Sequence, residues 1–233
     1  MKVAIVSQGL RIRLLSRETE QRANPFRSAI SNGHAIGFRR MTQINLIVGL
    51  GNPGQQYRDT RHNAGFWLID ELIAHHGETL RFETRFKGDT ARIPIAVSNV
   101  HILRPRTFMN ESGQSIGSFI RYFDIQPHAV LIIHDDLDLD PGSVRLKIGG
   151  GHAGHNGLRD IISHIDSNAF VRLRIGIGHP GSAHQVTDYV LQKPPGGERK
   201  AIFEVILRSI GLMDEIILGD HAAVMNKLHP LDC

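Results

Sequence analysis

The feature that most constrains the fold is the alternation of short apolar strands with amphipathic helical segments from residue 44 onward. Continuous apolar runs predict buried strands at 44–48 and 129–133, and alternating apolar and basic residues predict half-buried strands at 144–148 and 171–177. Three short strands follow one another directly at 82–86, 90–97 and 100–103. Helical spacing predicts helices at 66–73, 109–123, 158–165, 185–191 and 198–218. We therefore expect an α/β protein: a single-domain, three-layer fold with a central mixed, largely parallel sheet flanked by helices.

Charge and cysteine content constrain the class of protein and its partners. Residues 1–40 contain eight Lys or Arg against two Glu, whereas residues 41–233 contain 19 basic and 21 acidic side chains. A nucleic-acid site in the body must then be a local patch gathered by the fold. The only cysteine is Cys233, and no apolar run approaches the roughly 20 residues of a membrane span. We expect a soluble cytoplasmic protein that binds no membrane.

Residues 1–40 show no sustained periodicity, and the pattern changes at Met41. Three interpretations stay open: an Arg-rich organelle-targeting segment, a basic interaction tail, or translated sequence ahead of a true start at Met41. We expect a basic extension that is disordered or not part of the native chain, followed by one folded domain at residues 41–233.

Residues 49–54, GLGNPG, match the G-x-G-x-x-G pattern of dinucleotide-binding loops directly after a predicted strand. That pattern requires a helix that begins at the loop and presents its free N–H groups to a pyrophosphate. Residues 55–63 are uniformly polar, and Asp70 interrupts a helical apolar face instead of ending a second strand. The context therefore argues against a dinucleotide site.

Residues 113–117, GQSIG, match the G-x-S-x-G pattern of a hydrolase nucleophile elbow. An elbow joins a strand to a helix, but Ser115 falls inside a predicted helix. We interpret these small residues as a helix surface that packs closely against a neighbour.

Residues 134–140, HDDLDLD, bring four carboxylates and an imidazole together at the end of a predicted strand. Such a cluster could bind a metal ion, although its spacing matches no common metal motif. Alternatively, one carboxylate at the carboxyl end of a buried strand orients a histidine from elsewhere, and Asp138 and Asp140 are solvated turn residues.

Residues 149–157, GGGHAGHNG, hold five of the chain's glycines beside two histidines, between a basic strand and a helix. Glycines at this density let the backbone approach a ligand closely, and Asn156 is a plausible helix N-cap. Lys147 before the loop and Arg174 on a later strand could converge on a phosphate, or each could be a solvated charge.

From residue 44 to about residue 229 the chain resembles bacterial-type peptidyl-tRNA hydrolase. The resemblance rests on six blocks in order: VGLGNPG with Tyr57, TRHNAG at 60–65, residues 105–113 with Phe108, Met109 and Asn110, His134–Asp135, residues 147–157, and GIGHPG at 176–181. It implies that residues 41–233 are the catalytic domain of a monomeric esterase that needs no metal or cofactor. The implied reaction cleaves peptide from the 3′-terminal ribose of peptidyl-tRNA and returns free tRNA to translation.

The resemblance also implies roles for the reacting groups. His62 would deprotonate the attacking water, and Asp135 would hold the imidazole in the correct tautomer. Asn110 would donate its amide to the developing oxyanion or fix the water. Asn52 would recognise the N-acyl group of the substrate, and Asn156 would bind the substrate near the ester.

Further residues would bind the tRNA end, again by resemblance. Tyr57 and Phe108 would stack with the terminal adenosine or ribose, next to Met109. Lys147 and Arg174 would clamp the tRNA 5′-phosphate. Two more arginines are candidate helpers of this clamp: Arg145 and Arg172.

Ala153 stands where the family commonly has glycine, a mild change if φ is negative there and a strained one if φ is positive. Two rival functions stay open. One is a metal-dependent hydrolase that uses His134, Asp135, His152 and His155. The other is a noncatalytic RNA-binding module whose sheet holds a tRNA end.

Overall fold

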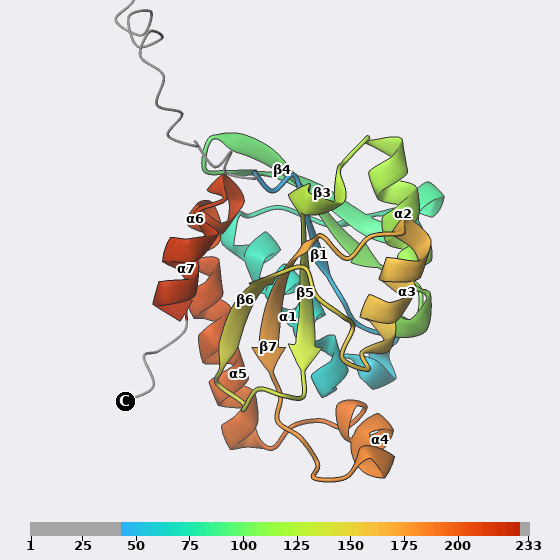
Figure 1. Ribbon diagram of the computed structural model, residues 1–233, viewed down its shortest axis with the longest axis vertical. Helices are drawn as coiled ribbons and strands as arrows, with labels where there is room; N and C mark the ends of the chain where they lie inside the picture. The colour runs from blue at the N-terminus through green and yellow to red at the C-terminus, as the bar shows by residue number, and fades with distance from the viewer. Residues whose placement is uncertain (1–42, 229–233) are drawn as a thin grey trace, which may run out of the picture. The chain divides into compact units, whose positions relative to one another are not determined.

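Seven strands form one mixed sheet at the centre of the structure (Figure 1). The computed structural model describes residues 43–228, so the predicted extension at 1–40 lies outside the described residues. The order across the sheet is β2-β3-β4-β1-β5-β7-β6. The strands are β1 (Leu46–Gly49), β2 (Arg81–Glu83), β3 (Gly88–Ile95), β4 (Ser98–Pro105), β5 (Val130–Asp136), β6 (Val144–Ile148) and β7 (Val171–Gly176).

Parallel pairing is confined to the four central strands: β1 pairs in parallel with β4 and β5, and β5 with β7. The outer pairs β2–β3, β3–β4 and β6–β7 are antiparallel. The predicted mixed sheet is therefore confirmed. The carboxyl ends of β4, β1, β5 and β7 meet at one edge of the sheet, which is where α/β proteins place their ligand sites.

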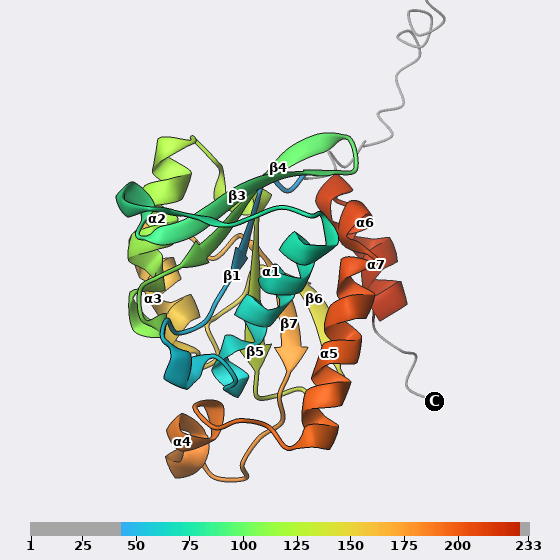
Figure 2. The ribbon, with the colours of Figure 1, turned by 180° about the vertical axis from the view of Figure 1, so that it is seen from behind.

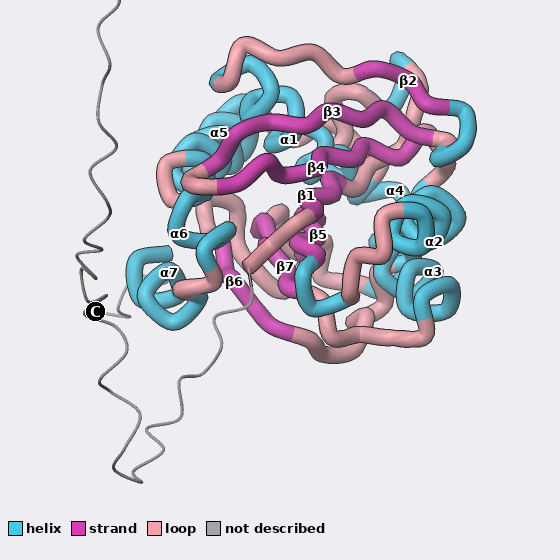
Figure 3. The backbone as a smooth tube through the Cα atoms, turned by 90° about the horizontal axis from the view of Figure 1, so that it is seen from above, coloured by secondary structure: helices cyan, strands magenta, loops and turns pink. Residues whose placement is uncertain are grey.

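Helices cover both faces of the sheet, as predicted (Figures 2 and 3). Helices α2 and α3 lie on one face, and α1, α5, α6 and α7 lie on the other. None of the helices between residues 43 and 228 is long and apolar enough to cross a membrane. The helices are α1 (Ala64–His75), α2 (Ser112–Tyr122), α3 (Asn156–Ile165), α4 (Val186–Val190), α5 (Gly196–Ile210), α6 (Met213–Leu218) and α7 (His221–Leu228).

Alternation along the strands divides the core between the two faces. Leu46 and Val48 of β1 pack with α2 and α3, whereas Ile47 packs with α1 on the opposite face, and all three are fully buried. Because side chains alternate along a strand, a run with no polar position can be buried on both faces. Each such aliphatic side chain stabilises the fold by about 1.5–3 kcal/mol.

Several predicted elements have different boundaries in the structure. The segment predicted as one helix at 198–218 is divided into α5 and α6, and α7 was not predicted. Only the first part of 82–86 is a strand, because Thr84–Phe86 forms a 3₁₀ turn. A 3₁₀ turn, Met109–Glu111, also precedes α2. Strand β5 continues beyond 133 to Asp136, so the predicted polar cluster begins inside the strand.

The structure agrees with the interpretation of the two short motifs, GLGNPG at 49–54 and GQSIG at 113–117. Two 3₁₀ turns, Gln55–Tyr57 and Arg61–Asn63, follow β1, and the first helix begins only at Ala64. Ser115 is buried within α2, and a Cβ at Gly113 would lie 2.4 Å from the Asp160 carbonyl oxygen of α3. The small-residue surface of α2 therefore packs closely against α3, as inferred, and does not form an elbow.

Helix α1 packs unusually close to the sheet because glycines face each other there. A Cβ at Gly65 would lie 2.5 Å from both the Ile133 oxygen and the Leu50 nitrogen, and one at Gly49 would lie 2.4 Å from the Gly65 oxygen. The polar turn before α1 is held by Trp67, whose indole Nε1 donates to the Arg58 carbonyl at 2.8 Å. These contacts fix the start of α1, and with it the turn that carries His62.

We expect Gly65→Ala to lower the free energy of unfolding by about 1–3 kcal/mol, because a Cβ there meets backbone atoms that cannot rotate away. The matched control is Gly197→Ala in the first turn of α5, where a Cβ meets nothing within 4 Å. This control should leave stability unchanged or raise it by up to about 1 kcal/mol. Urea denaturation measures both variants, and equal stability of Gly65→Ala and wild type would contradict the packing argument.

Candidate active site

A cavity of about 810 Å³ opens at the carboxyl ends of the central strands. Nine of the ten predicted site residues line it: Asn52, His62, Phe108, Met109, Asn110, Asp135, Lys147, Asn156 and Arg174. The tenth, Tyr57, lies beside the cavity with its ring edge-on to Phe108, at 6.3 Å between ring centroids. Segments far apart in the sequence thus meet at one site.

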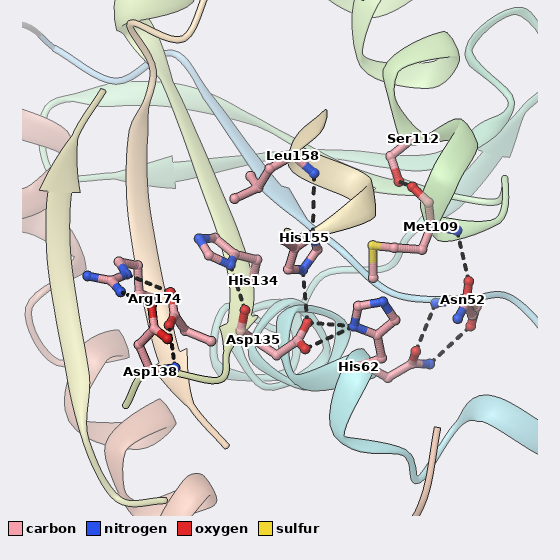
Figure 4. A network of polar contacts seen from close by, with 12 residues as sticks. Asn52, His62, Met109, Ser112, His134, Asp135, Asp138, His155, Leu158 and Arg174 are labelled. Atoms are coloured by element: carbon pink, nitrogen blue, oxygen red, sulfur yellow. Dashed lines mark hydrogen bonds and ion pairs between the residues drawn. The ribbon is translucent and has the colours of Figure 1, made fainter. Parts of the chain in front are cut away.

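His62 and Asp135 form a buried pair that lines the cavity (Figure 4). His62 comes from the 3₁₀ turn before α1, and Asp135 comes from the end of β5. The His62 Nδ1 atom lies 3.0 and 2.9 Å from the two carboxylate oxygens of Asp135. Because an ionised carboxylate only accepts hydrogen bonds, Nδ1 carries a proton, and in the neutral imidazole Nε2 is left with a free lone pair.

Asp135 binds a second imidazole that sequence reasoning did not assign to it. His155 Nε2 lies 3.1 Å from Asp135 Oδ1, and His155 Nδ1 accepts the Leu158 backbone N–H at 3.4 Å. His155 is therefore the N-cap of α3, and the prediction of Asn156 as N-cap is wrong. Asn156 is the exposed first residue of the helix, and its Oδ1 accepts from Arg159.

Each member of the pair shifts the pKa of the other. Burial raises the pKa of the Asp135 carboxyl, but the neighbouring His62 and His155 outweigh it and hold this pKa well below its usual range. Burial lowers the pKa of His62, but the charge and hydrogen bond of Asp135 outweigh it and raise this pKa above its ordinary value. Asp135 thus stays ionised and favours the imidazolium form of His62.

All four residues of the rival metal site line the cavity, but only Asp135 and His155 of these four belong to a cluster whose ligand atoms could share an ion. His134 Nδ1 donates to the backbone carbonyl of Asp135 at 2.7 Å, and burial together with His155 lowers the pKa of His134 to about 3. His152 Nδ1 accepts the Gly154 N–H instead. Among residues 43–228, the cluster that could hold a metal ion is His62, Asp135 and His155. An ion there would replace the hydrogen bonds that now join the two imidazoles to the carboxylate.

Asn52 is held in one orientation by two neighbours. Its backbone N–H donates to Asn63 Oδ1 at 2.8 Å, and Asn63 Nδ2 donates to the Asn52 carbonyl at 3.0 Å. Its side-chain Oδ1 accepts the Met109 backbone N–H at 2.8 Å, so its Nδ2 group is left as a donor at the cavity wall. Asn63 was missed by sequence reasoning, although it stands next to His62 in the TRHNAG block.

Basic side chains extend from the cavity along β6 and β7. Lys147 and Arg174 line the cavity, and Arg174 Nε donates to Asp136 Oδ2 at 2.6 Å. Arg145 lies directly across the ladder from Arg174. Arg172, the other candidate helper, is only 3% exposed, and its guanidinium bonds to backbone carbonyls of the glycine loop.

Ala153 in the glycine loop has a φ of 47°, in the left-handed region. The replacement of the expected glycine is therefore the strained case. A Cβ in this conformation costs about 1 kcal/mol relative to glycine. The loop keeps this conformation against a local preference, which requires anchoring contacts around it.

Comparisons with known proteins agree with this arrangement. A family model described as peptidyl-tRNA hydrolase matches residues 46–232. The peptidyl-tRNA hydrolase of Methylococcus capsulatus is 50% identical over 186 residues, which cover 80% of this chain and 99% of that protein. The protein of the same name from Alkalilimnicola ehrlichii is 46% identical over 187 residues, 80% of this chain and 95% of that protein.

Solved structures give the same result at the level of the fold. A crystal structure of peptidyl-tRNA hydrolase from Acinetobacter baumannii matches with a TM-score of 0.79 and 47% identity, over 82% of this chain and 96% of that one. The family model covers the described region from residue 46 onward, including all the residues that line the cavity. The chain therefore belongs to the peptidyl-tRNA hydrolase family.

Proposed function

We propose that the chain hydrolyses the ester bond of peptidyl-tRNA, with His62 as the general base that activates water. The observation that carries this proposal is the buried His62–Asp135 pair, whose free Nε2 atom belongs to a residue lining the cavity. A general base must lie within hydrogen-bond reach of the proton that it removes and be oriented by a third group. Family membership supports peptidyl-tRNA as the substrate, and the His62–Asp135 pair supports general-base activation of water.

In this mechanism the water oxygen forms a bond to the ester carbonyl carbon while its proton passes to His62 Nε2. The negative charge of Asp135 stabilises the imidazolium that results. The tetrahedral intermediate then collapses, the C–O bond to the ribose breaks, and the imidazolium returns the proton to the leaving 3′ oxygen. The products are a peptide with a free carboxyl group and a tRNA with a free 3′ hydroxyl.

Asn110 is the proposed stabiliser of the reacting oxygen atoms. It is exposed at the cavity wall, directly after Met109, whose backbone N–H is fixed by Asn52. Its amide group either donates to the developing oxyanion or holds the water for attack. A donor in either position typically contributes about 10²–10³-fold in rate.

Asn52 is proposed to bind the N-acyl group of the substrate. Because its Oδ1 is occupied by the Met109 N–H, its Nδ2 donor is the group left for a substrate. An N-acyl group offers a carbonyl acceptor to this donor, whereas a free α-ammonium group offers only donors. This arrangement would spare ordinary aminoacyl-tRNA.

The tRNA end would bind on both sides of the reacting ester. Phe108 is 51% exposed and is flanked by Tyr57, so this pair offers an aromatic surface for the terminal adenosine or ribose. Lys147 and Arg174 are proposed to bind the 5′-phosphate, with Arg174 aimed by its bond to Asp136. Asn156 would bind near the ester. By family resemblance, we also propose that the protein acts as a monomer in the cytoplasm.

We expect His62→Ala to lower the rate of N-acetyl-aminoacyl-tRNA hydrolysis by about 10²–10⁴-fold, because the water loses its base. The matched control is His128→Ala, which changes an exposed histidine at the opposite end of β5 and should keep the wild-type rate. Wild-type activity should persist in EDTA. Activity that disappears in EDTA and returns with Zn²⁺ would support the metal-dependent rival, and binding without turnover would support the RNA-binding rival.

The pH dependence of kcat/KM should follow the titration of His62. Only the neutral imidazole accepts a proton, so the rate should rise with pH and reach half its plateau above the ordinary histidine value of about 6.5. In Asp135→Asn the raising influence is lost while burial still disfavours the imidazolium, so the midpoint should fall and the plateau should drop by about 10²–10⁴-fold. A midpoint that does not move in Asp135→Asn would contradict the pairing.

We expect Asn52→Ala to reduce hydrolysis of N-acetyl-aminoacyl-tRNA by about 10–100-fold, which corresponds to one lost hydrogen bond of about 1.5–3 kcal/mol. The slow hydrolysis of free aminoacyl-tRNA should change little, so the ratio of the two rates falls. Asn99→Ala, at the amino end of β4 and far along the strand from the cavity, is the control. An unchanged ratio in Asn52→Ala would remove Asn52 from substrate recognition.

A further inference from the structure

Arg172 is placed differently from the other basic residues of β6 and β7. The residue is 3% exposed, whereas Lys147, directly across the ladder, is exposed to solvent. Its guanidinium carbon lies 4.7 Å from the centroid of the Phe170 ring. Arg172 also lines the cavity, but its guanidinium cannot bind a phosphate through both Nη atoms without leaving its present partners.

Those partners are backbone carbonyls of the glycine loop. Arg172 Nη1 donates to the Gly151 oxygen at 2.5 Å, and Nη2 donates to the Gly150 oxygen. The loop is fixed again one residue earlier, where the Gly149 N–H donates to the Phe170 carbonyl at 2.9 Å. Two neighbouring carbonyl acceptors match the two donors of the guanidinium fork and do not match the single point charge of a lysine.

The loop conformation depends on these bonds. Gly149 and Gly150 have φ values of 65° and 101°, which are accessible to glycine, and the next two carbonyls, of Gly150 and Gly151, accept from the two Nη atoms of one guanidinium. Beyond them, Ala153 holds a strained φ of 47°. Backbone strain of this kind persists only where the surroundings over-determine the conformation.

The loop positions groups at both of its ends. At one end, His155 bonds to Asp135, and Asn156 lines the cavity. At the other, the Lys147 side chain passes over Gly150, where its Cε would lie 3.0 Å from an added Cβ. A loop released from the guanidinium would misplace both sets of groups, and displacements near 1 Å can cost about 10²-fold in rate.

We propose that Arg172 is a positioning residue that holds the glycine loop in its active conformation, and that it is not a ligand of the tRNA phosphate. This inference rests on the proposed function, because it assigns the loop to the hydrolysis of peptidyl-tRNA. The chemistry that distinguishes the two roles is the 5′-phosphate itself. A phosphate ligand has nothing to bind in a substrate that lacks this group, whereas a loop-positioning residue acts on every substrate.

The test compares N-acetyl-aminoacyl-tRNA carrying a 5′-phosphate with the same substrate carrying a 5′-hydroxyl. Arg172→Lys keeps the charge but not the fork, and it should lower kcat about 10–100-fold on the 5′-hydroxyl substrate, with KM changed less. Arg172→Gln, which keeps an amide donor, is assayed alongside it. Arg174→Gln should show the pattern of a phosphate ligand, a reduced preference for the 5′-phosphorylated substrate. Arg92→Lys, on the exposed side of β3, should behave as wild type.

Hydrogen exchange of residues 149–156 provides the second measurement. The amides of Gly149, Gly154 and His155, which donate hydrogen bonds, should be protected in wild type and in Arg174→Gln, and should exchange faster in Arg172→Lys, with the overall fold checked by circular dichroism. Arg172→Lys with kcat within twofold of wild type on the 5′-hydroxyl substrate would overturn the inference, as would unprotected loop amides in wild type. A wild-type chain that turns over neither substrate would instead contradict the proposed function.

Discussion

The site depends on one buried carboxylate that accepts hydrogen bonds from two imidazoles. Asp135 is 2% exposed, and an unpaired carboxylate at such a position costs several kcal/mol. Its two donors come from opposite layers: His62 from the turn before α1, and His155 from the N-cap of α3. Compensation of this charge therefore joins the helices on both faces of the sheet at the end of β5, and folding and proton transfer depend on the same contacts.

Much of the fold could be predicted because its central strands are apolar on both faces. The run at the start of β1 has no polar position, so it fits only a buried strand. The division between α5 and α6 could not be predicted, because both helices bury apolar residues in one core cluster and the pattern continues across the break. Helix α7 was missed because it buries only His221, Val224 and Leu228, too sparse a pattern for periodicity to detect.

The site residues and the contact between His62 and Asp135 were predicted from motif resemblance, and the other contacts that support the site were not. The adjacency of His62 and Asn63 in the sequence does not show which backbone groups their side chains bind in the folded protein. The glycine loop predicted close backbone approach to a ligand, yet two of its carbonyls face Arg172. Alternation placed Arg172 and Arg174 on one face correctly, and both line the cavity, but it could not show that the Arg172 guanidinium is bonded to backbone carbonyls of the glycine loop.

Trp67 is the only tryptophan in the chain, and its indole bonds to the polar turn that leads to His62. Its ring stacks on Phe203 of α5 at 5.4 Å between centroids, with the Arg199 guanidinium 5.2 Å from the indole ring. The tryptophan fluorescence of this protein therefore originates at a single place, on the back of the turn that bears the proposed base. The molecule carries a built-in optical reporter of that turn, without any label.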